Sequence, residues 1–400
     1  MKSPLLLSLL AATTAFASAP ALAQERDFRT CLADIKAEAL RQGVPAAIAD
    51  NAFRNLTPDP KVIDLDGRQP EFSLTYGKYV GSSVSADRIA KGQQKLAQNR
   101  ALLTALEQEY GVPPQYLMAF WGLETNFGGY MGDFSVVRSV ATLACSTKRT
   151  VFFSNETVQA LRILSMNHMT AAQMKGSWAG AMGNMQFMPS TFTKWAVDRD
   201  GNGKIDIWAS VPDALTSGAN FLRGIGFKPG LPSSDEVTLP ANFPLDQADT
   251  TVEKPVGAWA AMGVKLAGGK ALPASSEPAS ILLPAGFRGP AFIIYPNFKA
   301  VMNWNRSTLY ALAVGILAKQ IAGGPAVMQP PPADDEPLAR DTVIDMQTRL
   351  AKLGFYGDDV DGLLGPKTRS GVRLFQKQQG IPADGHPTAD VVQRLQRAAR

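Results

Sequence analysis

The chain has 400 residues, of which 45% are hydrophobic, with a formal net charge of +5 and a pI near 9.1. A chain of this length can bury more than one core, so we expect more than one domain. Its charges are interspersed rather than clustered, which gives little support to nucleic-acid binding, and a mildly basic surface equally suits another anionic polymer.

The first residues have the pattern of a secretory signal peptide, residues 1–23. A basic start precedes an apolar run that extends to Phe16, and Ala21-Leu22-Ala23 forms a small-residue cleavage site. The mature chain is expected to begin near Gln24, without a cysteine at the cleavage point that could carry a lipid. No later segment has the length and apolar character of a membrane span, so we expect an exported protein without one.

Cys31 and Cys145 are the only cysteines in the sequence. In an oxidising compartment such a pair favours a disulfide over a metal site, with two buried free thiols as the alternative. Whether the two thiols lie close enough to pair depends on the fold.

The segment that follows has the periodicity of helices rather than of strands. Apolar residues recur at helical spacing over residues 27–56, 88–110, 157–169 and 213–225, and in an apolar run that begins at Tyr116. Residues 230–290 are instead rich in Pro, Gly, Ala and Ser, and we expect them to form a small inserted subdomain of β and irregular structure. Residues 292–295 are predicted as a strand and residues 307–321 as a helix.

The last part of the chain is set off by a proline-rich stretch. Residues 323–337 contain three consecutive prolines and an acidic run, which predicts a stiff, solvated linker. Residues 338–400 then form a small helical unit that would be marginally stable alone. The expected order is a signal peptide (1–23), a main domain (24–322), a linker (323–337) and a C-terminal domain (338–400), in a mainly α (α+β) fold.

Glu124 is the only charge in the apolar run that begins at Tyr116. It continues the stripe of Leu117, Phe120 and Trp121, so its carboxyl is expected to lose hydration, which raises its pKa. The helix dipole acts in the same direction, because it disfavours a negative charge in the last helical turn. A carboxylic acid that stays protonated near neutral pH suits a general acid. The alternative is a glutamate that faces water at a helix end.

Three other segments combine polar and aromatic residues. From Ser177 to Pro189, small residues let the backbone approach a ligand, Gln186 offers a donor and an acceptor, and Phe187 offers apolar surface. The alternative is a tightly packed crossing with methionines as core filler. The second segment, Lys148-Arg149 with Phe152-Phe153, would suit carboxylates and sugar rings, and its alternative is a solvated helix start. The third consists of the amides around Trp304, which would suit a carbohydrate site or else form an ordinary helix cap.

The segment from Asp198 to Asp213 has the opening of a calcium loop. Asp198, Asp200 and Asn202 stand at alternate positions before Gly203, and Lys204 would contribute its backbone carbonyl. The twelfth position is not the glutamate of an EF-hand, so Asp213 is expected to serve instead. We therefore expect a structural Ca²⁺ ion, with a metal-free acidic turn as the alternative.

Other chemistry has little support in the sequence. His168 and His386, its two histidines, do not make a zinc cluster. We find no phosphate loop, no dinucleotide-binding glycine pattern and no convincing Ser–His–Asp or Cys–His set.

Taken in order, these motifs resemble the membrane-bound lytic transglycosylase B family of bacterial murein-cleaving enzymes. The resemblance covers about residues 27–322 and is carried by Tyr110-Gly111-Val112-Pro113, Gly122-Leu123-Glu124-Thr125, Lys148-Arg149, Phe152-Phe153, Gly180-Ala181-Met182-Gly183, Gln186-Phe187-Met188-Pro189-Ser190, the segment from Ala196 to Trp208, Asn297-Phe298, Asn305 and Ser307. The tail resembles the peptidoglycan-binding repeat domain through Leu353-Gly354-Phe355-Tyr356, Asp361-Gly362, Gly365-Pro366 and Phe375-Gln376. The chain departs from the family at Asn184-Met185, where a small or aromatic pair is usual, and at Phe152, where some members have tyrosine.

The resemblance implies a lysozyme-like helical domain with a small inserted subdomain, and a three-helix peptidoglycan-binding domain. It implies cleavage of the MurNAc-β-1,4-GlcNAc bond without water, which leaves a 1,6-anhydro-MurNAc end, with Glu124 as the single acid that then acts as base. Ser177, Gln186, Phe187 and Asn305 would line the glycan groove, and Arg149 with Phe152 would help to bind substrate.

The same resemblance sets the expected surroundings. The chemistry needs no cofactor, and the protein is expected to be a periplasmic monomer. Its partners would be peptidoglycan glycan strands and proteins of cell-wall synthesis or division, with no nucleic acid. Two alternatives remain, a hydrolytic muramidase of the same fold and a non-catalytic peptidoglycan-binding scaffold.

Overall fold

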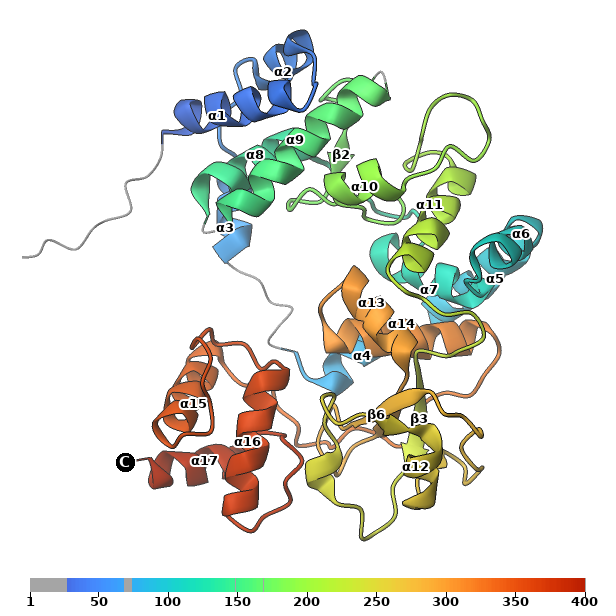
Figure 1. Ribbon diagram of the computed structural model, residues 1–400, viewed down its shortest axis with the longest axis vertical. Helices are drawn as coiled ribbons and strands as arrows, with labels where there is room; N and C mark the ends of the chain where they lie inside the picture. The colour runs from blue at the N-terminus through green and yellow to red at the C-terminus, as the bar shows by residue number, and fades with distance from the viewer. Residues whose placement is uncertain (1–26, 68–73, 148, 168, 400) are drawn as a thin grey trace, which may run out of the picture.

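The computed structural model describes residues 27–67, 74–147, 149–167 and 169–399, so the predicted signal peptide lies outside the described residues. Helices dominate the first half of the chain, as predicted (Figure 1). They are α1 (Phe28–Arg41), α2 (Ala46–Phe53), α3 (Pro60–Gly67), α4 (Tyr76–Ser83), α5 (Ala86–Gln98), α6 (Arg100–Tyr110), α7 (Pro114–Thr125), α8 (Val136–Ser146), α9 (Thr150–Met166), α10 (Pro189–Trp195) and α11 (Val211–Gly224). Within the described ranges, no helix combines the length and the apolar character that crossing a membrane requires.

Residues 88–110, predicted to be helical, form two helices, α5 and α6, rather than one long helix. The break falls at Asn99, whose side chain donates to the Lys95 carbonyl oxygen at 2.9 Å. The same carbonyl also accepts the Asn99 backbone amide at 3.1 Å, and asparagine competes with the helix in this way because its short amide reaches nearby backbone. Gly111, at φ 72°, ends α6 in the left-handed conformation that glycine adopts without strain.

The predicted disulfide between Cys31 and Cys145 is present. It joins α1 to the end of α8, across 114 residues of sequence, with the two Cα atoms 5.8 Å apart. Both α1 and α8 also pack against α9, so the disulfide closes a group of three helices that already share a core.

A five-stranded antiparallel sheet forms the inserted subdomain. Its strands are β3 (Ser234–Thr238), β4 (Lys254–Pro255), β5 (Lys265–Leu266), β6 (Pro278–Leu282) and β7 (Ala291–Ile294), in the order β4-β6-β7-β3-β5. Alternate residues of β7 point to opposite faces. Phe292 and Ile294 belong to the main core, whereas Ala291 and Ile293 pack with Trp259 of the short helix α12 (Val256–Ala261). The sheet is therefore covered on both sides.

Two helices after the sheet return to the main core. These are α13 (Pro296–Trp304) and α14 (Thr308–Ile321), and α14 packs along α7 and against β3. Ten residues of α14 are buried, and the helix is apolar around most of its circumference. Such a helix is stable only in the interior, so α14 connects the helical part of the fold to the sheet.

Most residues of the linker are exposed, and several of them also bond to the main domain. The Glu236 carboxylate accepts hydrogen bonds from the backbone amides of Met328 and Gln329 at 2.7 and 2.8 Å. Asp334 pairs with Arg288, and Glu336 pairs with Lys78 at 3.0 Å. Carboxylates of the linker thus pair with cations of the main domain, and linker amides donate to a main-domain carboxylate.

The C-terminal domain is a small bundle of α15 (Arg340–Lys352), α16 (Pro366–Gln378) and α17 (Ala389–Ala398) around its own core. It docks beside the inserted subdomain (Figure 1). Arg373 forms a buried ion pair with Asp249, and the Ser370 hydroxyl donates to the same carboxylate at 2.8 Å. The Phe287 amide donates to Asp384 at 2.9 Å. The interface therefore contains buried polar groups that are paired across it.

Candidate active site

Helix α7 places Glu124 in its last turn. Pro114 occupies the first turn, where its missing amide costs nothing, and eight of the twelve helix residues are buried. Glu124 itself is half-buried, between the fully apolar part of α7 and the surface. The helix ends at Asn126, and both Asn126 and Phe127 have positive φ, at 52° and 61°.

Two aromatic side chains that are distant in sequence bond to the Glu124 carboxylate. The Trp304 indole donates to Oε1 at 2.9 Å, and the Tyr310 hydroxyl donates to the same oxygen at 2.5 Å. Burial raises the pKa of Tyr310 well above its usual value, and the neighbouring Glu124 charge raises it further. Tyr310 therefore remains a protonated donor throughout the physiological range.

Trp304 is itself held by a group of aromatic rings. Its ring centroid lies 4.4 Å from that of Phe120 and 4.8 Å from that of Phe221. Phe187, predicted to offer a surface in the glycan groove, packs on Trp304 at 5.5 Å and is only 1% exposed. Its ring therefore supports Trp304 from within the core.

The loop between Ser177 and Pro189 forms a tight turn next to α7. The Ser177 hydroxyl accepts the Ala181 amide at 3.0 Å, and Met182 pairs with Phe187 in an isolated antiparallel bridge. Gln186 has a positive φ of 49°, and its amide nitrogen donates to the carbonyl oxygens of Met131 and Gly183 at 3.2 and 3.1 Å. The side chain is thus bonded both to its own turn and to the segment that follows α7.

Glu156, a residue that sequence reasoning did not single out, anchors the far end of this loop. It is 1% exposed and accepts hydrogen bonds from the Ser190 amide at 2.8 Å and the Ser190 hydroxyl at 2.6 Å. Burial raises the pKa of this carboxyl, although the bonds from Ser190 oppose the shift. No local feature of the sequence shows that α9 would cap α10 in this way.

The remaining predicted binding residues lie in two places. Asn305 follows Trp304 and accepts the Ser307 amide at 3.1 Å, so it sits beside the Glu124 cluster. Arg149 and Phe152 lie instead at the start of α9. Arg149 pairs with Asp66 at the end of α3 and stacks over Phe153 at 4.9 Å. Phe152 is 49% exposed, and Lys148 lies outside the described residues.

The predicted calcium loop gathers three carboxylates. Asp198, Asp200 and Asp213 have oxygens within 4.8 Å of one another, and Asp213 is fully buried. Slight burial acts to raise the pKa of Asp198, but the amides of Gly203, Gly201 and Asn202 lower it below its usual value. Asn202 turns back to accept the Lys204 amide at 2.9 Å. Hard oxygen ligands on a turn with positive-φ glycines fit a calcium ion.

Comparison with known proteins shows the family of this chain. The model of the transglycosylase SLT domain family matches residues 27–319. The chain belongs to this family. It is 30% identical over 260 residues to the membrane-bound lytic murein transglycosylase B of Escherichia coli K12, which covers 61% of this chain and 67% of that protein. A peptidoglycan binding domain model matches residues 339–395. The protein is thus a lytic murein transglycosylase that acts on peptidoglycan, as the sequence resemblance predicted.

Solved structures of the transglycosylase family confirm the lysozyme-like fold. SltB3 from Pseudomonas aeruginosa, in complex with NAG-anhNAM-pentapeptide, is 42% identical with a TM-score of 0.88, over 92% of this chain and 99% of that chain. Slt35 from Escherichia coli, in complex with calcium, is 27% identical with a TM-score of 0.63, over 73% of this chain and 92% of that chain.

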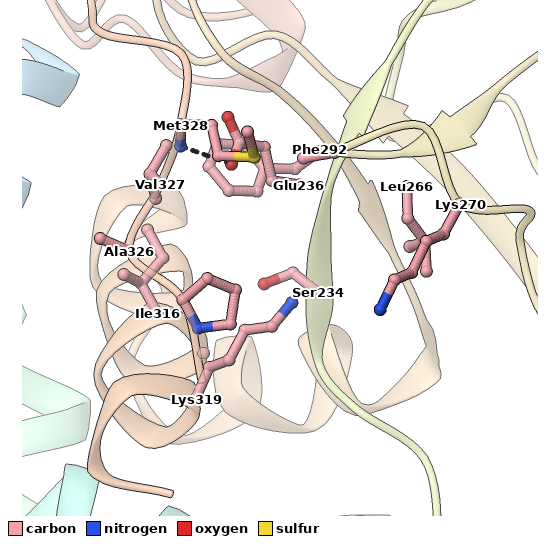
Figure 2. A pocket seen from close by; sticks show the side chains of 13 residues that line it. Ser234, Glu236, Leu266, Lys270, Phe292, Ile316, Lys319, Ala326, Val327 and Met328 are labelled. Carbon is pink, nitrogen blue, oxygen red and sulfur yellow. Dashed lines mark hydrogen bonds between the residues drawn. The ribbon is translucent and has the colours of Figure 1, made fainter. Parts of the chain in front are cut away.

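A pocket of about 250 Å³ lies elsewhere in this transglycosylase (Figure 2). Its walls come from the inserted sheet, from α14 and from the start of the linker, with Lys270 and Lys319 on one side and Met328 on the other. Lys319 is neutralised by Asp235, and Glu236 is occupied by the Met328 amide. The pocket is lined mainly by apolar groups and does not include Glu124 or its two donors.

Proposed function

We propose that Glu124 is the single catalytic acid and base of this lytic transglycosylase. The observation that carries the proposal is the pair of neutral donors, Trp304 and Tyr310, on one carboxylate oxygen. An sp² oxygen has two lone pairs, and both donors use Oε1. In this proposal the transferable proton therefore sits on Oε2.

The reaction has two steps. First, Glu124 donates its proton to the glycosidic oxygen as the bond from that oxygen to C1 of MurNAc breaks, and the substrate N-acetyl group stabilises the cationic C1. The Glu124 carboxylate then takes the proton of the MurNAc 6-hydroxyl, whose oxygen bonds to C1. The 1,6-anhydro ring forms, no water is consumed and Glu124 regains its proton. Donors of fixed position favour this cycle because they stabilise the carboxylate when it appears.

The loop and α13 supply the groove in this proposal. Ser177, Gln186 and Asn305 contact the glycan near Glu124, while Arg149 and Phe152 at the start of α9 bind a more distant part of the substrate. Phe187 supports Trp304 rather than the sugar. In the relative SltB3, the bound ligand combines NAG, anhNAM and a pentapeptide, which supports a groove that accepts a peptide-bearing glycan.

The acidic loop is proposed to hold one Ca²⁺ ion through Asp198, Asp200, Asn202, the Lys204 carbonyl and Asp213. When bound, the ion would cross-link the loop, and no step of the reaction uses it. The calcium in the structure of the relative Slt35 supports this assignment.

The wider setting extends the proposal. The C-terminal domain would retain the enzyme on peptidoglycan in the periplasm, where the predicted signal peptide directs it. In this proposal the enzyme acts as a monomer and also contacts proteins of cell-wall synthesis or division.

Product analysis on purified sacculi tests the proposal. Glu124→Gln keeps the size of the side chain but removes its acid, so release of soluble fragments should fall to background. Wild-type products should carry 1,6-anhydro-MurNAc ends by mass spectrometry. Reducing MurNAc ends would favour a hydrolytic muramidase instead, and sacculi left intact by the wild type would favour a scaffold.

A further inference from the structure

Asn184 lies in the loop between Ser177 and Pro189 and is buried against the end of α7. We propose that Asn184 is a positioning residue that ties the C-terminal turn of α7 to the backbone at Ile207 and Trp208, and so holds Glu124 in place. The inference rests on the proposed catalytic role of Glu124.

The Asn184 carboxamide bridges two separate parts of the fold. Its Oδ1 accepts the Trp121 indole N–H of α7 at 2.8 Å. Its Nδ2 donates to the carbonyl oxygens of Ile207 and Trp208 at 3.0 and 2.9 Å. The residue is 3% exposed, so each of these bonds forms away from water, where losing one leaves a buried polar group unpaired.

The backbone of Asn184 reinforces the same connection. Its amide donates to Ile207 at 2.9 Å, and its carbonyl oxygen accepts the Thr125 hydroxyl of α7 at 2.9 Å. Trp121 lies three residues before Glu124, and Thr125 lies one residue after it. Both residues point to Asn184, which therefore fixes the helical turn that carries the acid.

The chain just beyond Glu124 needs such support. Asn126 and Phe127 both adopt positive φ, which non-glycine residues hold only where the surrounding structure imposes it. The Thr125 hydroxyl accepts the Gly128 amide at 3.0 Å, and a Cβ on Gly128 would lie 2.7 Å from Asn184 Oδ1. Asn184 is thus packed directly against the strained turn.

On its other side, Asn184 holds the exit of the acidic loop. Ile207 and Trp208 follow Asp206, whose amide donates to Asp213 at 2.8 Å. Asn167, at the end of α9, bonds to the same loop and is 4% exposed. Its side-chain amide donates to the Ile205 carbonyl oxygen at 2.6 Å, and its Oδ1 accepts the Ile205 amide at 3.2 Å. Asn167 makes no contact with α7 among these bonds, so it provides a matched control for the effect of loosening the loop alone.

The test compares Asn184→Leu with Asn167→Leu in the full-length protein on soluble glycan strands. Both substitutions should lower the thermal midpoint. Only Asn184→Leu should lower kcat, by about 10- to 100-fold for a displaced catalytic group, with KM changed less than about 3-fold. Equal loss of kcat in both variants, no loss in either, or a loss confined to KM would overturn the positioning role.

Two further measurements keep the result decisive if Asn184→Leu folds poorly. Thr125→Val keeps the side-chain volume but removes the hydroxyl that bonds to Asn184, and should lower kcat several-fold without raising KM. In protein with ¹⁵N-labelled tryptophan, the Trp121 indole N–H resonance, assigned by its loss in Trp121→Phe, should move in Asn184→Leu and stay in Asn167→Leu. An unmoved resonance, or an unchanged kcat in Thr125→Val, would contradict the proposal.

Glu124→Gln is measured beside these variants. If Glu124→Gln is inactive while Asn184→Leu keeps full kcat, only the positioning role fails. If Glu124→Gln is active, the proposed function itself fails.

Discussion

The docking of the C-terminal domain gives a prediction whose size follows from the contacts. Arg373→Met removes the cation of the buried pair and strands Asp249, whose side chain is 10% exposed. Breaking a buried pair costs about 3–5 kcal/mol. Asp249 keeps donors from the Thr251 amide, the Thr251 hydroxyl and the Ser370 hydroxyl, at 2.8, 2.9 and 2.8 Å. The cost should therefore lie near the lower end, about 3 kcal/mol, or roughly a 100-fold shift toward the undocked domain.

The opposite substitution should cost more. Asp249→Ala leaves the buried Arg373 cation without its carboxylate. Among the described residues its Nε has no hydrogen-bond partner, and its other bonds are to the carbonyl oxygens of Ala248 and Asp384, which carry no charge. The double variant should recover part of the loss, because it leaves neither charge buried alone. Lys377→Ala is the matched control, since its pair with Asp246 is largely exposed and worth less than about 1 kcal/mol.

The assays are small-angle scattering, for the separation of the domains, and limited proteolysis of the linker. Arg373→Met should expand the protein and speed cleavage of residues 323–337, and Lys377→Ala should do neither. If Arg373→Met behaved like Lys377→Ala, the buried pair would not hold the domain, and the reasoning from burial would be refuted.

The same pair predicts how docking depends on pH. Burial acts to raise the pKa of Asp249, but the Thr251 amide, the Arg373 charge and the Ser370 hydroxyl together bring it below its usual value of 3.8. A lowered folded-state pKa means that the pair contributes its full stability above 3.8 and loses it as the pH falls through the folded value. Scattering should therefore show expansion only in acid below that range.

Three further changes test other parts of the molecule. Tyr310→Phe removes a donor to Glu124, and the loss of a bond to a charged group, about 1.5–3 kcal/mol, should lower kcat/KM roughly 10- to 100-fold. The control Tyr116→Phe loses a buried hydroxyl bonded to Ser233 and should leave kcat/KM unchanged. Equal losses in the two variants would refute the assignment. Calcium should raise the thermal midpoint of the wild type, and a calcium concentration of 100 times the dissociation constant should add about 2.7 kcal/mol to its stability. It should not raise the midpoint of Asp213→Asn. Equal responses of the two proteins would exclude this loop as the calcium site. Replacing Cys31 and Cys145 by serine should lower the free energy of unfolding by about 4–5 kcal/mol, because the bond closes 114 residues, as urea titration can measure.

The sequence predicted best those features that depend on neighbours along the chain. Glu124 stood out as a lone charge in an apolar run, and the acidic loop stood out by its spacing. The donors to Glu124 had no such signal, because Trp304 and Tyr310 lie 180 and 186 residues away and meet it only through the packing of α13 and α14. Phe187 belonged to a recognisable motif, yet only the structure shows that its ring lies in the core.

The linker shows a different limit of sequence reasoning. Prolines and acidic residues predicted a solvated spacer, and most of its residues are exposed, but its composition did not predict the bonds that it makes to the main domain. Here Asp334, Glu336 and the Met328 amide each meet a complementary group on the main domain. Composition reports what a segment would prefer alone, whereas the partners are set by the tertiary fold.

Helix α14 connects the inserted sheet to the Glu124 carboxylate. Tyr310, in its first turn, bonds to Glu124, while Lys319, in its last turn, pairs with Asp235 of β3. Between them, a Cβ on Gly315 would lie 2.6 Å from the hydroxyl oxygens of Ser233 and Ser234, so the helix approaches the sheet as closely as only glycine allows. A shift of the sheet must therefore move α14, and with it the donor on Glu124. The insertion is therefore part of the scaffold that positions Glu124, since Leu282, Phe292 and Ile294 of its strands belong to the same core as α7.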